Sequence, residues 1–120
     1  AFTFCKKGDG LSVTYDASST VEKWKEEGFL NLKAQGYQAG VIAFKRFSPI
    51  MNKWAENCIF HHKEEYSEQT ALSHTLYKNT FNFSPLPSIY NWLDPRNIPP
   101  DAAIIHYGGE ENKIQLIKEV

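Results

Sequence analysis

The sequence has few cysteines and no long apolar run, and each shortage excludes a class of protein. Its 120 residues include two cysteines, Cys5 and Cys58, too few for the disulfide framework of a small secreted domain, although one bridge between them stays open. No apolar stretch approaches the roughly 20 residues that cross a bilayer, and the N-terminus lacks the pattern of a signal peptide. The sequence therefore predicts a soluble, cytoplasmic protein without a transmembrane segment, and a luminal location stays open for a longer precursor.

An excess of one charge sign is also missing. The chain carries 13 basic and 14 acidic side chains, for a formal net charge of -1. This balance gives no overall positive field to hold a nucleic acid, so we expect no nucleic-acid partner. An apolar share of 42% and an aromatic share of 14% are enough to build a core. We therefore interpret residues 1–120 as a single domain or a partial domain.

Apolar clusters separated by turn-forming residues predict four strands. They are Ala1–Cys5, Leu11–Tyr15, Tyr37–Phe44 and Ala102–His106. The run Tyr37–Phe44 is apolar over most of its length, which is typical of a central strand buried on both faces. Ala102–His106 is also predicted to be a buried strand. It ends in a histidine that stands just before the glycine pair Gly108-Gly109.

Capping residues and apolar periodicity predict four helices. They run from Thr20 to about Glu27 after the N-cap Ser19, from Ser48-Pro49 onward, from just after Ser67 to Asn79, and over Glu110–Val120. Two of them show an inward apolar stripe, formed by Ile50, Met51, Trp54, Ala55 and Cys58 in one helix and by Ala71, Leu72 and Leu76 in the other. The proline-rich and aromatic stretch Phe81–Pro100 predicts a long ordered loop.

His106 is the residue whose position most suggests chemistry. A buried strand that delivers an imidazole to its own end, beside glycines that let backbone approach a ligand, is one way to build a metal or phosphate contact. A histidine at a strand end is also commonly an ordinary hydrogen-bonded residue. A second possible metal cluster, of Cys58, His61, His62 and His74, matches no zinc-site spacing, and the two adjacent histidines fit better as the end of a helix.

Four short segments resemble, in this order along the chain, the C-terminal half of nucleotide-sugar-dependent glycosyltransferases of the GT-A fold, especially the family-8-like group. The segments are Tyr37–Phe44, Glu68–Leu72, Tyr90–Trp92 and Ile104–Gly109. The resemblance implies an α/β fold, a partial GT-A domain with a mixed sheet flanked by helices. It covers roughly residues 37 to 109, and it identifies the chain as the acceptor-side half of such an enzyme.

The resemblance also implies roles for particular residues. His106 would help to hold a manganese or magnesium ion against the diphosphate of the donor, where the ion offsets the charge of the leaving group. Gln69, with Glu68 beside it, would lie nearest the reacting carbon. The residues implied to contact substrates are Gln38, Ala39, Gly40, Trp92, Gly108, Gly109 and Lys113.

The sequence also departs from the family pattern. The family binds its metal ion through Asp-x-Asp, and no two of the four aspartates here have that spacing. Glu68 and Gln38 stand where the family usually has aspartate and asparagine, and Lys113 is one position out of register. The preceding nucleotide-binding half is missing from this chain. We therefore expect the isolated chain to be inactive, and a half-domain to dimerise, aggregate or expose a sheet edge.

The sequence thus predicts part of a metal-dependent enzyme that transfers a sugar from a nucleotide donor to a hydroxyl of a saccharide, lipid or protein. The alternative is a non-catalytic α/β module that binds a glycan or a protein through its aromatic loop. Tyr90 and Trp92 fit both hypotheses, since aromatic faces can cover a sugar ring or anchor a loop on the core.

Overall fold

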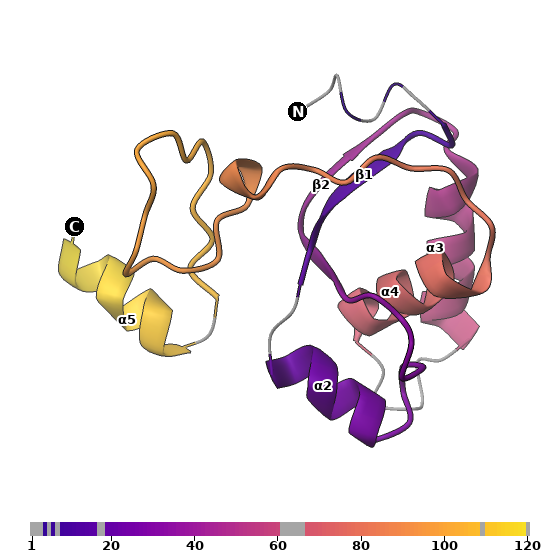
Figure 1. Cartoon of the computed structure of the whole chain (residues 1–120), viewed down its shortest axis with the longest axis horizontal. Helices are drawn as coiled ribbons and strands as arrows, with labels where there is room; N and C mark the ends of the chain where they lie inside the picture. Colours follow the sequence, from indigo (N-terminus) through magenta and orange to yellow (C-terminus); the bar gives the residue numbers. More distant parts are fainter. Residues whose placement is uncertain are drawn as a thin grey trace. The chain divides into compact units, whose positions relative to one another are not determined.

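The computed structural model describes residues 4, 6, 8–16, 19–60, 67–108 and 110–119. The chain divides into two compact units, an N-terminal unit (Ala1–Leu86) and a C-terminal unit (Pro87–Val120). The described residues form two strands and four α-helices (Figure 1), so the mixed α/β class is confirmed. Among these residues, no helix is both long enough and apolar enough to cross a bilayer.

The sheet of the N-terminal unit is an antiparallel pair, β1 (Leu11–Tyr15) and β2 (Tyr37–Phe44). Both strands have the predicted bounds. The register changes between Val13, which faces Ile42, and Thr14, which faces Gln38. Three residues of β2 therefore bulge out opposite a single step of β1, and the glycine in the bulge, Gly40, is exposed.

The prediction that β2 is a central strand buried on both faces is wrong. Within the described residues β2 pairs with β1 alone, and only Tyr37 and Ala43 are buried along its length. The apolar run includes small residues at the bulge, and it does not mean that both faces of the strand are buried. Continuous apolar composition therefore overstated the burial of this strand.

β1 has neighbours on both sides. An irregular segment, residues 82–86, follows its second edge: the Asp9 N–H donates to the Asn82 carbonyl (2.7 Å), and the Leu86 N–H donates to the Val13 carbonyl (2.8 Å). The Ser12 hydroxyl adds a bond of 2.6 Å to the Ser84 carbonyl. β1 is consequently the buried element of the sheet, with Leu11 and Val13 fully inaccessible.

α2 (Ser19–Glu26) ends where the sequence predicts. Gly28 has φ +81°, its N–H donates to the Lys25 carbonyl, and the next N–H, that of Phe29, donates to the Trp24 carbonyl. This is the Schellman arrangement, which needs a residue that tolerates positive φ. Ser19 is the first helical residue rather than a cap outside the helix.

Two helices cover the sheet. α3 (Pro49–Phe60) packs on α4 (Glu68–Lys78), and α4 packs on β2. α4 has the predicted caps: the Ser67 hydroxyl accepts from the Thr70 N–H at 3.1 Å, and Asn79 closes the other end. Ser48, predicted as the cap of α3, uses its hydroxyl instead to bond the Asp9 carbonyl at 2.6 Å.

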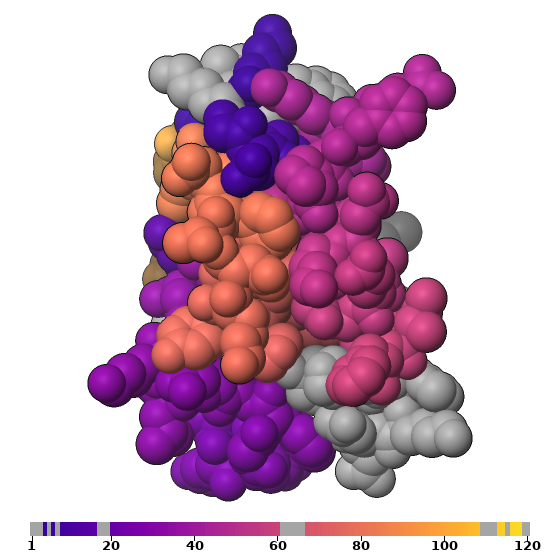
Figure 2. All heavy atoms as spheres, turned by 90° about the vertical axis from the view of Figure 1, so that its right-hand side faces the viewer, coloured from indigo at the N-terminus to yellow at the C-terminus, as the bar shows by residue number. Residues whose placement is uncertain are grey.

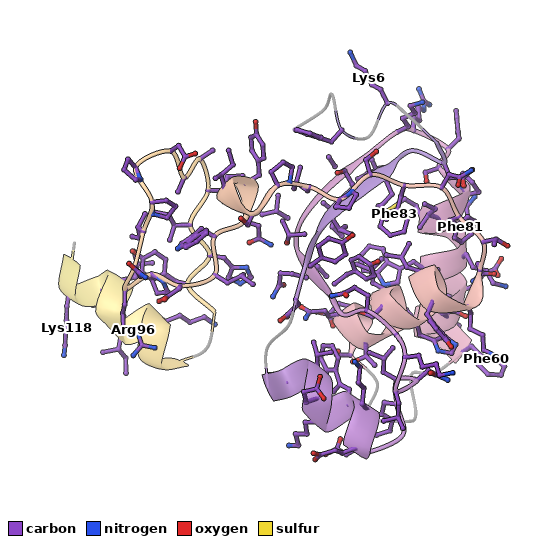
Figure 3. All side chains as sticks on the ribbon, in the orientation of Figure 1. Lys6, Phe60, Phe81, Phe83, Arg96 and Lys118 are labelled. Atoms are coloured by element: carbon purple, nitrogen blue, oxygen red, sulfur yellow. The ribbon has the colours of Figure 1, made fainter. Side chains whose placement is uncertain are left out.

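The main core lies between the strands and these helices. Its buried members are Leu11, Val13, Tyr37, Ile50, Leu72 and Leu76. Phe81 and Phe83 pack against it and point between the strands and the helices in Figure 3. The predicted α3 stripe is confirmed for Ile50, is half-buried at Met51, Trp54 and Cys58, and is wrong for Ala55, which is exposed because α4 covers too narrow a part of α3.

The phenol of Tyr37 makes the free energy of unfolding of the N-terminal unit depend on pH in the alkaline range. Burial, with a smaller contribution from Tyr15, raises the pKa of the Tyr37 phenol to about 12. In the unfolded chain the Tyr37 phenol ionises near pH 10. The stabilisation that comes from keeping this phenol neutral is therefore complete below pH 10 and is lost as the pH rises toward 12. Because phenylalanine does not ionise, we expect Tyr37→Phe to lose about 1–2 kcal/mol less free energy of unfolding than the wild type over this pH range. Urea denaturation of the wild type and the variant at pH 9 and pH 11.5 measures this difference. An equal loss of stability in the two proteins between these pH values would contradict the prediction.

The C-terminal unit contains a short 3₁₀ turn, η1 (Ser88–Tyr90), and a terminal helix, α5 (Glu110–Glu119). The predicted irregular loop and terminal helix are therefore confirmed. The predicted buried strand Ala102–His106 is wrong: this segment forms one isolated parallel bridge, Trp92 with Ile105, and Ile104 and Ile105 are 41% and 36% exposed. A single neighbour with few paired groups cannot bury both faces of an extended segment.

Two further predictions fall on residues that the structure does not describe. Most of the predicted strand Ala1–Cys5 lies outside the described residues, and Phe4, which is described, is helical. His61 and His62, predicted to end a helix, also lie outside them. α3 is described as far as Phe60.

Candidate functional site

Gln69 joins the two segments of the N-terminal unit that the sequence places in one site. It is the second residue of α4, and its side-chain amide oxygen Oε1 accepts the Ala39 N–H of the β2 bulge at 3.4 Å. Its amide nitrogen donates to a carboxylate oxygen of Asp16 at 2.9 Å. The structure therefore brings Ala39 and Gln69, predicted to share a site, into contact.

Asp16 is a functional candidate that sequence reasoning missed. It follows the last residue of β1, is 5% exposed, and its N–H donates to the Gly36 carbonyl at 2.9 Å. A carboxylate this buried must be paired, and the Gln69 amide is one of its partners. The available signal was an acidic residue directly after a strand, although spacing alone could not show that it faces α4.

The β2 bulge satisfies its own backbone through side chains. The Gly40 N–H donates to the side-chain amide oxygen Oε1 of Gln38 at 2.9 Å, and the Ala39 N–H donates to that of Gln69. These two donors would otherwise face outward at the bulge as unpaired edge groups. Gln38, Ala39 and Gly40 therefore form a rim beside Gln69 in which the two backbone donors are paired.

Glu68 is the exposed first residue of α4. Its carbonyl accepts the indole N–H of Trp54 at 2.7 Å, which fixes the start of the helix against α3. A carboxylate in the first helical turn is favourable because of the helix dipole. Of the predicted pair Glu68 and Gln69, Gln69 is the one whose side chain bonds to the bulge and to Asp16 among the described residues.

The other two segments of the resemblance meet in the C-terminal unit. The Trp92 N–H donates to the Ile104 carbonyl at 2.9 Å, and the His106 N–H donates to the Trp92 carbonyl at 2.7 Å. The imidazole Nδ1 of His106 lies 3.1 Å from the Asn91 side-chain oxygen, and Asn91 is 1% exposed. Because an amide oxygen only accepts, Nδ1 is the donor in this bond, and in a neutral imidazole Nε2 would then carry the lone pair.

This bond sets what His106 can do. A histidine that donates from Nδ1 to a fixed oxygen has the orientation and tautomer of a metal ligand, or of a hydrogen-bond acceptor, at Nε2. Asn91 provides that fixed oxygen. Asn91 belongs to the segment Tyr90–Trp92 of the resemblance, but the sequence predicts no role for its side chain.

Trp92 is anchored by its indole. The ring N–H is shared between the carbonyls of Asp94 (2.8 Å) and Asn97 (3.0 Å), and the side chain is half-buried. This favours loop anchoring for Trp92.

The remaining predicted substrate contacts are Gly108, Gly109 and Lys113. Gly108 is exposed and its Cα region faces the His106 ring. Gly109 lies outside the described residues, and Lys113 is an exposed residue of α5.

The alternative metal cluster gains no support from the described residues. Among them no group of three His, Cys, Asp or Glu side chains is placed to hold a metal ion. Burial, and to a lesser extent the Glu68 carboxylate, raises the pKa of the Cys58 thiol. Cys58 therefore holds its proton more tightly than an ordinary thiol, which disfavours the thiolate form that binds metal ions.

Comparison with known proteins adds no family assignment. No protein-family model, no curated protein sequence and no solved structure matches the chain.

Proposed function

We propose that the chain is the acceptor-side part of a glycosyltransferase that takes a sugar from a nucleotide donor. One observation carries this: four segments picked from the sequence as parts of one site form two contacting pairs. Gln69 contacts the β2 bulge in one unit, and Asn91-Trp92 pairs with Ile104–His106 in the other. These two contacts support the proposal because each joins segments that the resemblance assigns to one site.

Gln69 has the hydrogen-bonding capacity that a sugar site needs. Its amide group offers two N–H donors and two lone pairs, and Asp16 and Ala39 use one of each. One donor and one acceptor remain for sugar hydroxyls. With its orientation fixed from both sides, Gln69 would hold the donor sugar without losing side-chain entropy on binding.

A metal ion does not fit the described residues as a complete site. His106 would supply one ligand through Nε2, but the described residues provide no companion carboxylates around it. We therefore derive no step through a metal ion. The role assigned to His106 within this chain is to present an oriented acceptor at the end of the Ile104–His106 segment.

The test uses a chain extended upstream of Ala1 along its reading frame, assayed for sugar transfer and donor hydrolysis with a panel of nucleotide sugars and manganese. We expect activity from the extended protein and little from residues 1–120 alone. His106→Ala and Gln69→Ala should each lower kcat/KM at least about tenfold.

Gln35→Ala is the control, because Gln35 is an exposed glutamine on the segment that leads into β2. It should leave the rate unchanged. A rate that survives both His106→Ala and Gln69→Ala in the extended protein would overturn the proposal.

A further inference from the structure

We propose that the turn between β2 and α3, residues 45–48, is a docking point for an anionic lipid surface. The turn presents two cations and an aromatic ring, from Lys45, Arg46 and Phe47, all exposed. This inference is independent of the proposed sugar chemistry. Its argument begins with the backbone of the turn.

The turn is closed by hydrogen bonds, and its third residue has a strained backbone conformation. The Ser48 N–H donates back to the Lys45 carbonyl at 3.1 Å, and Phe47 occupies its third position with φ +66°. Positive φ at this position of a β-turn favours glycine or asparagine, and a bulky aromatic residue there is a genuine outlier. Both ends of the turn are tied down, by the Lys45 N–H to the Gly10 carbonyl and by the Ser48 hydroxyl to the Asp9 carbonyl.

The strain holds an apolar ring in water. Phe47 is 84% exposed, more than any other large apolar side chain described. The segment that joins β2 to α3 projects from the upper right of the surface in Figure 2. Because the side chain is not buried in the core, packing does not explain a phenylalanine at this position. The backbone conformation does not favour one either. A ring kept outward at a conformational cost is the pattern of a residue that inserts into something.

The charges beside the ring identify the kind of surface. The Arg46 guanidinium lies over the Phe47 ring, 4.9 Å from its centroid, and no ion pair involves Lys45 or Arg46 among the described residues. Lys6, also exposed, lies at the upper end of the same unit in Figure 3. Lys45 and Arg46 are therefore two adjacent cations that form no ion pair with any described residue, a local positive charge that the net charge of -1 does not reveal.

An anionic bilayer matches this chemistry better than a nucleic acid. The cations would meet lipid phosphates, and the ring would enter the boundary between headgroups and acyl chains. A single convex tip suits a flat, soft surface. A nucleic-acid strand would instead need a row of cations and stacking rings along a track.

The test measures co-sedimentation of residues 1–120 with vesicles of phosphatidylcholine alone and with about one third phosphatidylserine. We expect binding to the anionic vesicles that weakens as salt is raised. Lys45→Ala combined with Arg46→Ala should lower the partition coefficient about 25-fold, since each cation contributes about fivefold. Phe47→Gly should lower it about tenfold.

Phe47→Gly also separates binding from folding. Glycine accepts positive φ, so this variant should melt at the same temperature as the wild type or higher, while binding less. The matched controls are Lys33→Ala combined with Lys78→Ala, which removes two exposed cations elsewhere, and Leu32→Ala, which trims a side chain that is 76% exposed. Both should bind like the wild type.

Three results would overturn the proposal. One is equal binding to neutral and anionic vesicles. Another is equal loss of binding in the turn variants and the controls. The third is tight binding of a single-stranded oligonucleotide through the same residues with none to vesicles.

Discussion

Gln69→Glu will destabilise the N-terminal unit by about 2–3 kcal/mol at pH 7, and adding Asp16→Asn will restore most of the loss. The single change puts a second carboxylate at the position of an amide that donates to Asp16 over 2.9 Å. Two carboxylates so close cannot both ionise cheaply, and Asp16 is 5% exposed. In the double variant the introduced amide donates to the introduced carboxylate, which still accepts the Ala39 N–H.

The pH dependence of Gln69→Glu follows from the same pair. Mutual repulsion raises one carboxyl pKa in the folded variant above its unfolded value, so the folded state binds a proton more tightly. Stability is then highest at acid pH and is lost as pH rises through the raised pKa. The deficit relative to wild type should shrink as pH is lowered from 7 to 4.5, in chemical-denaturation curves.

Gln35→Glu is the matched control, because it makes the same substitution at an exposed glutamine. It should change stability by less than about 0.5 kcal/mol. If the double variant were no more stable than Gln69→Glu, the Asp16 to Gln69 bond would not be a main link between β1 and α4.

Gly36→Ala should cost about 3 kcal/mol, the other large effect we expect. A methyl group on Gly36 would stand 2.5 Å from the Asp16 carbonyl oxygen and 2.6 Å from a methyl of Val21. The first contact is with backbone, which cannot turn aside as a flexible side chain can. The substitution would push β2 away from the end of β1 and displace Asp16.

Gly28→Ala provides the comparison for this experiment. Gly28 has φ +81° but nothing within 4 Å of an added methyl group, so strain alone should cost about 1 kcal/mol. Thermal denaturation of both variants separates crowding from conformational strain. Equal losses in the two would show that the close approach of Gly36 to Asp16 is unimportant.

Elements with a local signal could be predicted from the sequence. β2 begins and ends at the predicted residues, α4 has the predicted cap at Ser67, and Gly28 ends α2 with the expected backbone geometry. Each of these depends on residues within a few positions of one another. Caps, turns and apolar periodicity act over that range, and for this reason they can be recognised without coordinates.

Features set by distant residues could not be predicted. The burial of β2 depends on whether another strand joins its second edge, and the apolar run cannot reveal this. Ala102–His106 has strand-like composition, yet it pairs through one bridge to Trp92. Asp16 acquires its role from Gln69, 53 residues later, so no window of sequence contains both partners.

The sequence predicted candidate residues but not the bonds that orient them. Gln38, Ala39, Gly40, Gln69 and His106 were chosen from the sequence, and the contact between Ala39 and Gln69 is present. The side chains that orient them, Asp16 and Asn91, were not given roles. Orientation by a neighbouring polar group depends on atomic distance, and composition carries no record of it.

The segment at residues 82–86 has a consequence for how the chain is made. β1 leaves the ribosome before the residues that follow its second edge, which come 72 and 73 positions later along the chain, as the bonds from Ser12 to Ser84 and from Asn82 to Asp9 show. Until they emerge, a nascent chain presents β1 with one side uncovered, which invites pairing with other copies. Truncation before residue 82 should therefore yield inclusion bodies.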